Sequence, residues 1–250
     1  MAEQSQFAGR PWIAIIAVIF SLLSPGLLWA GTFQVNPVRV ELTAQQKSAA
    51  LTVQNNGDEP VVVQLQTVDW TQVDGKDVYQ PSADLLATPP IFTIQPGTTQ
   101  IVRVGLRREP DAGQELSYRL FLQEVPAPPK PGFRGLQMTL RVGLPVFLQP
   151  KNKAAPELMW KVQQESKDRI KVSLKNEGKA HVQVTDFSVF VPGNEQALAV
   201  QQVARYLLPG QAGEWQLKTN PAQAPSADHV HVTAYTDAGK VDADVALDKP

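Results

Sequence analysis

The chain has 250 residues, with 23 lysines and arginines against 24 aspartates and glutamates, and it contains no cysteine. The near-zero net charge excludes a global field that would recruit nucleic acid or an anionic membrane, and the lack of cysteine excludes disulfides, thiol catalysis and cysteine-bound metals. The length suits two domains of about 120 residues, each with an adequate core.

Residues 1–30 are typical of a secretory signal peptide, and we expect cleavage after Ala30. Arg10 precedes an apolar run, 12–23, and Pro25 follows it. Because this run is shorter than the roughly 20 residues that a membrane-spanning helix needs, a membrane anchor is the weaker interpretation. The sequence therefore predicts an exported protein whose mature chain is not inserted in a membrane.

After residue 30, helical periodicity nearly disappears and short alternating runs are separated by Gly, Pro, Asn and Asp, which predicts an all-β fold. Pro37 removes a ladder donor and therefore suits an edge strand or a switch between sheets. Thr88-Pro89-Pro90 offers an X-Pro bond that is a candidate for the cis form, at the end of an irregular segment. The strands expected in the first half cover residues 33–42, 49–54, 61–70, 91–94, 99–107, 114–125 and 136–148.

The last of these runs, 136–148, has two faces of different character. Leu136, Met138, Leu140 and Val142 alternate with polar or small residues, so they share one face of a long strand. Alternation alone favours an ordinary internal strand of a sandwich. Its length also allows a strand that packs its own core with some side chains and offers others to a partner.

A polar, proline-bounded stretch at 150–156 marks the expected boundary between domains at 31–150 and 151–250. Beyond it, a second and smaller sandwich is the economical interpretation. Asp242 and Asp244 are assigned to turns, where solvated capping is the usual role. The strands expected in this half cover residues 158–163, 170–175, 182–191, 205–208, 213–218 and 229–235.

The sequence offers little support for an enzyme. His229 and His231 would lie on one strand face about 7 Å apart, but zinc needs a third ligand and His181 has no motif relation to them. Hydrolase, metalloprotease and phosphate-loop motifs are absent from residues 31–250. We therefore expect no catalytic residues, no metal and no cofactor. Nucleic-acid binding is also disfavoured, because Arg107-Arg108 is a single short basic pair without interleaved aromatics.

Several segments of the first half resemble the periplasmic pilus (fimbrial) chaperones of the chaperone–usher pathway, a family known for its sandwich architecture and for donor-strand complementation. The resemblance covers about 33–150 in order, whereas the second half is similar only in length and strand pattern. The segments that carry it are Asn36–Leu42, Asn55–Gly57, Thr88–Pro90, Ile94–Arg103, Tyr118–Pro126 and, as the donor strand, Leu136–Pro150.

This resemblance implies two immunoglobulin-like β-sandwich domains in a boomerang arrangement. It also implies binding of pilus or fimbrial subunits in the periplasm and their delivery to an outer-membrane usher. A subunit that lacks one strand would receive the chaperone's strand, with Leu136, Met138, Leu140 and Val142 entering its groove. The strand's ending looks more like the divergent archaic branch of these chaperones.

The family also holds the subunit's C-terminal carboxylate with an arginine of the first strand and a lysine of the donor strand. Arg39 falls on the arginine position, but the lysine position aligns with Pro145, which has no charge. Arg119 and Arg141 are the available substitutes, because a guanidinium suits a carboxylate. We prefer Arg119, which lies on the strand expected beside the donor strand.

A different class of function shares the same fold and leader. A secreted immunoglobulin-like adhesion or carbohydrate-binding module would present loops rather than a strand to its ligand. It would bind sugars and ignore strand-deficient subunits, which separates the two hypotheses by experiment.

Overall fold

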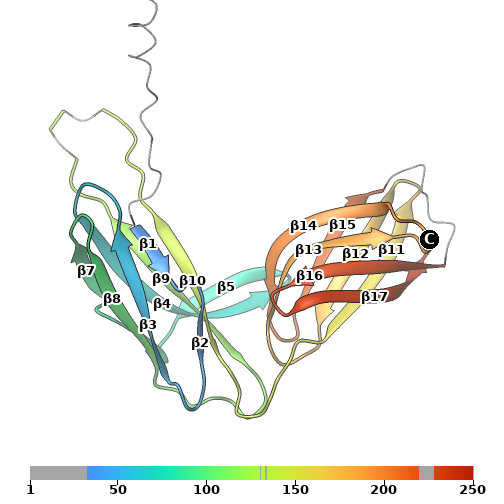
Figure 1. Ribbon diagram of the computed structural model, residues 1–250, viewed down its shortest axis with the longest axis horizontal. Coiled ribbons are helices and arrows are strands. Elements are labelled where there is room, and N and C mark those ends of the chain that lie inside the picture. Colours follow the sequence, from blue (N-terminus) through green and yellow to red (C-terminus); the bar gives the residue numbers. More distant parts are fainter. Residues whose placement is uncertain (1–32, 130, 133, 220–227, 250) are drawn as a thin grey trace, which may run out of the picture.

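The structure is a computed structural model that describes residues 33–129, 131–132, 134–219 and 228–249. The expected signal peptide lies outside these residues. The described chain forms two β lobes that meet at an angle, and we call the inner side of this angle the crook (Figure 1). Within it, no helix is long and apolar enough to cross a membrane. The all-β prediction is confirmed.

The first lobe, here the first sandwich, packs two sheets against each other. One sheet has the order β1-β3-β8-β6, and the other has the order β2-β10-β9-β4-β5, with β7 pairing to β4. The strands are β1 (Phe33–Asn36), β2 (Val40–Leu42), β3 (Ser48–Asn55), β4 (Val61–Val73), β5 (Lys76–Pro81), β6 (Leu85–Thr88), β7 (Ile91–Ile94), β8 (Thr99–Leu106), β9 (Leu116–Val125) and β10 (Arg141–Leu148).

Pro37 marks the place where the chain changes sheets. Before it, β1 pairs antiparallel with β3, and after it, β2 pairs parallel with β10 in the other sheet. The predicted sheet switch is confirmed, because a residue without an N–H and with a fixed φ interrupts one ladder and starts another. The Asn36–Pro37 and Thr88–Pro89 bonds are both cis.

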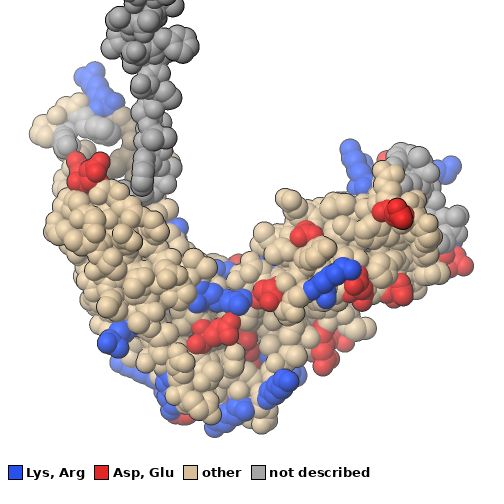
Figure 2. All heavy atoms as spheres, in the orientation of Figure 1, with Lys and Arg blue, Asp and Glu red and all other residues tan. Residues whose placement is uncertain are grey.

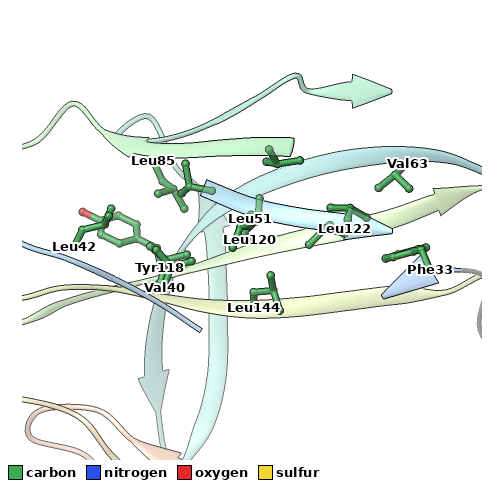
Figure 3. Close-up of a cluster of buried hydrophobic side chains, with 14 of the residues drawn as sticks. Phe33, Val40, Leu42, Leu51, Val63, Leu85, Tyr118, Leu120, Leu122 and Leu144 are labelled. Carbon is green, nitrogen blue, oxygen red and sulfur yellow. The ribbon is translucent and has the colours of Figure 1, made fainter. Parts of the chain in front are cut away.

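The core of the first sandwich follows from strand alternation. Leu120 and Leu122 of β9 face Leu144 of β10, and Leu51 of β3 packs on them from the other sheet, so that all four are fully buried (Figure 3). Each buried aliphatic side chain of this kind stabilises a fold by roughly 1.5–3 kcal/mol. Successive residues of β9 and β10 therefore alternate between this core and the outer face of the sheet.

The second lobe, the second sandwich, is one seven-stranded sheet, with the order β14-β13-β16-β17-β11-β12-β15, folded onto itself. Its core joins Val162 and Ile170 of one side to Phe187 and Val232 of the other. The strands are β11 (Leu158–Ser166), β12 (Arg169–Asn176), β13 (Val182–Phe190), β14 (Ala197–Leu207), β15 (Ala212–Lys218), β16 (His229–Thr236) and β17 (Gly239–Asp248).

Several strands differ from the sequence-based expectation. β5 and β6 lie in the segment predicted to be irregular, and β14 begins eight residues before the predicted 205. β5 is largely exposed and has no alternation of buried apolar residues, and it pairs with β4 along its whole length. The assignment of Asp242 and Asp244 to turns is wrong, because both lie in β17, where Val241, Ala243, Val245 and Leu247 alternate with polar residues.

Candidate functional site

β10 is bonded along one edge and mostly free along the other. It pairs with β9 from Arg141 to Leu148, but β2 covers only Val146–Leu148 on the opposite edge. Among the described residues, the backbone edge from Arg141 to Pro145 therefore lacks a neighbouring strand. We call this stretch the open edge of β10. An exposed, unpaired edge is a template for another chain.

The register defines which residues serve the open edge. The carbonyl of Leu140 accepts the Glu124 N–H at 2.9 Å, so Leu140 and the even-numbered residues after it turn their backbone groups towards β9. The backbone groups of Arg141, Gly143 and Pro145 face the open edge instead. Pro145 consequently leaves the ladder with β9 intact and removes a donor from the open edge.

The segment before β10 is not a strand, which corrects the predicted start at residue 136. β10 begins at Arg141 because β9 ends at Val125, just before the proline-rich loop, and the Leu140 N–H bonds the Glu124 carboxylate at 3.0 Å instead of another backbone group. Residues 136–139, which precede β10, have no strand partner among the described residues.

The four expected donor side chains divide into two pairs. Leu136 and Met138 are 84% and 82% exposed, whereas Leu140 and Val142 are partly buried against the core of the first sandwich. All four continue the alternation of Leu144, which faces that core. Leu136 and Met138 are thus accessible to a partner, whereas Leu140 and Val142 already pack against the first sandwich.

Arg119 lies directly opposite Pro145 in the β9–β10 ladder, on the outer face of the sheet. Its Nη1 donates to the carbonyl of Gly143 at 3.3 Å, so the guanidinium crosses β10 and reaches the open edge. The ring of Trp70 lies 3.9 Å beneath its Cζ, and the ring of Tyr206 lies 5.6 Å away. These contacts hold the positive charge of Arg119 beside Pro145, which carries no charge itself.

Arg39 precedes β2 at the mouth of the crook and is engaged by two carboxylates. Its Nη1 lies 2.6 Å from Asp237 Oδ2 of the second sandwich, and its Nε lies 3.3 Å from Glu41. Burial lowers the pKa of Arg39, but the hydrogen bond to Asp237 and the negative charge of Glu41 outweigh it, so the pKa is raised. Arg39 is therefore charged but already paired.

Arg141, the third expected candidate, is directed elsewhere. Its Cζ lies 4.1 Å over the ring of Phe121, and its Nη2 donates to Gln66 at 3.3 Å. Phe121 in turn lies against Gly143, where an added Cβ would approach the ring to 2.8 Å. The structure thus brings Arg119 to the open edge and holds Arg141 on the exposed part of the outer face.

Sequence reasoning missed the joint between the sandwiches. Phe147 of β10 stacks on His181 at 3.5 Å between ring centroids, and Trp70 meets Tyr206 edge-on at 5.5 Å. Gln72 accepts a hydrogen bond from the Leu208 N–H, and its amide donates to the Tyr206 carbonyl. This joint anchors the C-terminal end of β10 against the second sandwich, so the open edge points into the crook.

A cleft of about 380 Å³ lies beside the joint, between the two sandwiches. Figure 2 shows basic and acidic side chains next to each other in this crook. No local motif marks the cleft in the sequence, because its residues come from separate segments of both domains. Its charged and titratable residues are Arg39, Glu41, Glu115, Lys153, His181 and Asp237.

Of the two histidines considered as zinc ligands, His231 is engaged by carboxylates of its own domain. His231 contacts Asp244 at 2.8 Å and Asp242 at 3.4 Å, on the solvent-exposed face of the second sandwich. Within the described part of the chain, no group of three or more potential ligands is placed to hold a metal ion.

Residues 32–154 match the family model described as "Pili and flagellar-assembly chaperone, PapD N-terminal domain". Two curated relatives are 27% identical. One is the uncharacterized fimbrial chaperone YcbF of Escherichia coli, matched over 60% of this chain and 67% of the relative. The other is the chaperone protein FimB/FhaD of Bordetella pertussis, matched over 55% of this chain and 58% of the relative.

Solved structures share the whole two-lobed fold. The CsuC–CsuE chaperone–adhesin complex of archaic Csu pili from Acinetobacter baumannii contains a chain that matches with a TM-score of 0.63 and 20% identity, over 87% of this chain and 99% of that one. The SafA–SafB pilin–chaperone complex of Salmonella enterica gives 0.57 and 19%, over 87% and 97%.

The two immunoglobulin-like sandwiches, the crook and the open edge together define a two-domain pilus chaperone. The first sandwich and the linker after it, residues 32–154, belong to the family of pilus-assembly chaperones.

Proposed function

We propose that this protein is a periplasmic chaperone that binds pilus or fimbrial subunits by donor-strand complementation and delivers them to an outer-membrane usher. The observation that carries the proposal is the open edge of β10, preceded by two exposed apolar side chains, Leu136 and Met138. The action is binding alone, with no catalytic step, metal or cofactor. The ending of β10 favours the archaic branch of the family.

Complementation would proceed by strand addition at the open edge. Arg141 and Gly143 offer N–H and C=O groups to a subunit strand, and the ladder can extend over residues 136–139 when they adopt a strand conformation. Leu136 and Met138 would enter pockets of the incomplete subunit, contributing roughly 3–6 kcal/mol before association costs. Leu140 and Val142 add less, because they are already partly buried in the first sandwich.

Arg39 and Arg119 would hold the subunit's terminal carboxylate where the open edge meets the crook. Both guanidinium groups lie near Tyr206, whose pKa is raised by burial against the opposing positive charges of Arg39 and Arg119. Arg119 forms no ion pair with the described residues, and it reaches the Gly143 carbonyl at the open edge. It is therefore well placed to act where the family uses a lysine.

The proposed function is tested by co-expressing the protein with the secreted proteins encoded beside it and purifying the complexes. We expect a strand-deficient pilus subunit to co-purify in equal amount with the wild-type chain and to aggregate without it. A chain that binds glycans and leaves every such subunit insoluble would instead be an immunoglobulin-like adhesion or carbohydrate-binding module.

The anchor is tested by three arginine variants in the same assay. Arg39→Ala should abolish recovery of the complex and Arg119→Ala should reduce it strongly, because a buried charge contact to a carboxylate contributes roughly 2–5 kcal/mol. Arg141→Ala should have a milder effect, since its guanidinium lies over Phe121. Equal recovery with all three variants would contradict the anchor.

A further inference from the structure

The proposed anchor of the subunit carboxylate is already occupied by a carboxylate of the same chain. Asp237 lies in the turn between β16 and β17, and its Oδ2 is 2.6 Å from Arg39 Nη1 across the interface between the sandwiches. Glu41 takes the Nε side of the same guanidinium. A subunit terminus that approaches Arg39 would therefore meet two negative charges first.

Asp237 is held firmly in this position by its own domain. Its Oδ1 accepts the Gln183 N–H at 2.8 Å, its own N–H donates to the Gln183 carbonyl, and His181 Nε2 lies 3.6 Å from Oδ2. Burial raises the pKa of Asp237, but His181, the Gln183 N–H and Arg39 together lower it to about 2. The carboxylate is thus charged at neutral pH, and its side chain is only 19% exposed.

We propose that Asp237 is a built-in competitor of the subunit carboxylate, which occupies Arg39 in the free chaperone and is displaced when the subunit binds. This inference rests on the proposed function and assigns a regulatory residue to its anchor. A peptide C terminus carries the same functional group as Asp237, so the two compete for the same guanidinium fork.

The competition would make the anchor selective. Every peptide terminus carries a carboxylate, and a free arginine at the crook would bind any of them weakly. With Asp237 in place, a terminus gains from Arg39 only after it has replaced an existing ion pair, which requires the additional binding energy of the open edge. Arg119, which forms no ion pair with the described residues, would meet the incoming carboxylate first.

The displacement would also link subunit binding to the joint. The Arg39–Asp237 ion pair joins the two sandwiches, as do the Phe147–His181 stack and the Gln72 hydrogen bonds. Loss of the ion pair removes one of these contacts and leaves the others in place. The bound chaperone is then held by a different set of contacts from the free one.

The test compares two forms of the subunit that co-purifies with the wild-type chain. One form has its native C terminus, and the other is extended by Gly-Gly-Ser, which moves the carboxylate away from the anchor. Asp237→Asn keeps the hydrogen-bonding shape and removes the charge. We expect the preference for the native over the extended terminus, measured as a ratio of dissociation constants, to rise about three- to tenfold in this variant.

Asp242→Asn is the matched control, because Asp242 is a carboxylate of the same domain that contacts Lys240 and Thr233 on the exposed face. It should leave the ratio unchanged. An unchanged or reduced ratio in Asp237→Asn, with wild-type binding intact, overturns the competition and leaves the proposed function standing. If the wild-type chain binds no subunit, the proposed function fails and this inference fails with it. Unfolding curves of Asp237→Asn, with a midpoint close to wild type, exclude misfolding as the cause of a reduced ratio.

Discussion

Each sandwich has a buried asparagine at the end of one strand, and the two asparagines make the same kind of hydrogen bonds at the turn that follows, here called the corner. Asn55 ends β3 and Asn176 ends β12, and both side chains are fully buried. Each amide donates to a carbonyl four residues ahead at 2.8 Å and to a second carbonyl on a distant strand end, at 3.0 Å for Asn55 and 3.1 Å for Asn176. The two domains therefore share one construction at this corner.

The domains differ in the residues on and before their last strands, β10 and β17. β17 pairs with β16 along most of its length and with β11 only at Leu247 and Asp248, so it too has a largely uncovered edge. That strand carries Lys240, Asp242 and Asp244, which engage in ion pairs. β10 is instead preceded by the exposed Leu136 and Met138.

Charged side chains on an edge strand discourage pairing with other chains, whereas apolar ones invite it. The second sandwich thus has a protected edge, and the first has one that is open to a partner. At these last strands the two domains differ in the composition of the strand and of the about five residues before it.

The largest effect is expected when the segment before the open edge is given acidic residues like those of β17. Leu136→Asp combined with Met138→Asp should reduce subunit binding at least about 100-fold, because roughly 3–6 kcal/mol of apolar burial is lost and two charges would enter an apolar groove. Dissociation constants of the purified complex measure the loss.

The same double variant should unfold within about 0.5 kcal/mol of the wild type, since both side chains are exposed in the free chain. Met159→Asp, which changes an exposed methionine of β11 in the second sandwich, is the matched control and should bind subunit normally. Unimpaired binding by the double variant would show that the segment before β10 is not the donor.

The shared corner predicts a matched pair of stability losses. Asn55→Ala and Asn176→Ala should each lower the free energy of unfolding of their own domain by about 2–4 kcal/mol, because each removes the side-chain hydrogen bonds to a buried carbonyl, to a part-buried carbonyl and to a glycine N–H. Urea unfolding followed by fluorescence measures the loss, with Trp70 reporting on the first sandwich and Trp160 and Trp215 on the second.

Asn56→Ala provides the control for this pair. Asn56 is adjacent to the corner but only half-buried, so the change should cost less than about 0.5 kcal/mol. If Asn55→Ala lowers the free energy of unfolding as little as Asn56→Ala does, the Asn55 hydrogen bonds do not stabilise the first sandwich. The similarity of the two domains at this corner would then not contribute to stability.

These features differ in how far the sequence reveals them. The all-β class, the sheet switch at Pro37 and the turn after Asn55 follow from local residue chemistry, so sequence reasoning finds them. The start of β10 does not, because it depends on where β9 ends and on the Glu124 side chain that bonds the Leu140 N–H. The sequence shows that Pro145 lacks a donor, but only the register shows which edge loses it.

The joint is the least predictable part, for a physical reason. Trp70, Phe147, His181 and Tyr206 lie on four different elements of two domains, and no period within any one strand relates them. Asp237 shows the same limit: locally it is an ordinary turn residue, and its contact with Arg39 exists only because the domains meet at this angle. Local patterns specify the domains, whereas their relative placement comes from these contacts.

The smallest predicted effect concerns a pH dependence of this joint. Five residues after the two corner asparagines stand Pro60 and His181, so the second sandwich has a titratable group where the first has none. Burial lowers the pKa of His181, but hydrogen bonds to Asp237 and to Glu115 of the first sandwich, the latter at 2.7 Å, outweigh it and raise the pKa above 6.5.

Because the folded-state pKa of His181 is raised, its contribution to stability is fully present below the unfolded value of 6.5 and is lost as pH rises through the folded value. We therefore expect the wild type to lose up to about 1 kcal/mol more stability than His181→Gln between pH 5.5 and pH 8.5, measured by urea unfolding. His231→Gln is the control, since His231 is exposed and contacts only its own domain. Parallel pH profiles for the wild type and His181→Gln would mean that the joint is held by the Phe147 stack and the Gln72 hydrogen bonds alone, without a contribution from the charge on His181.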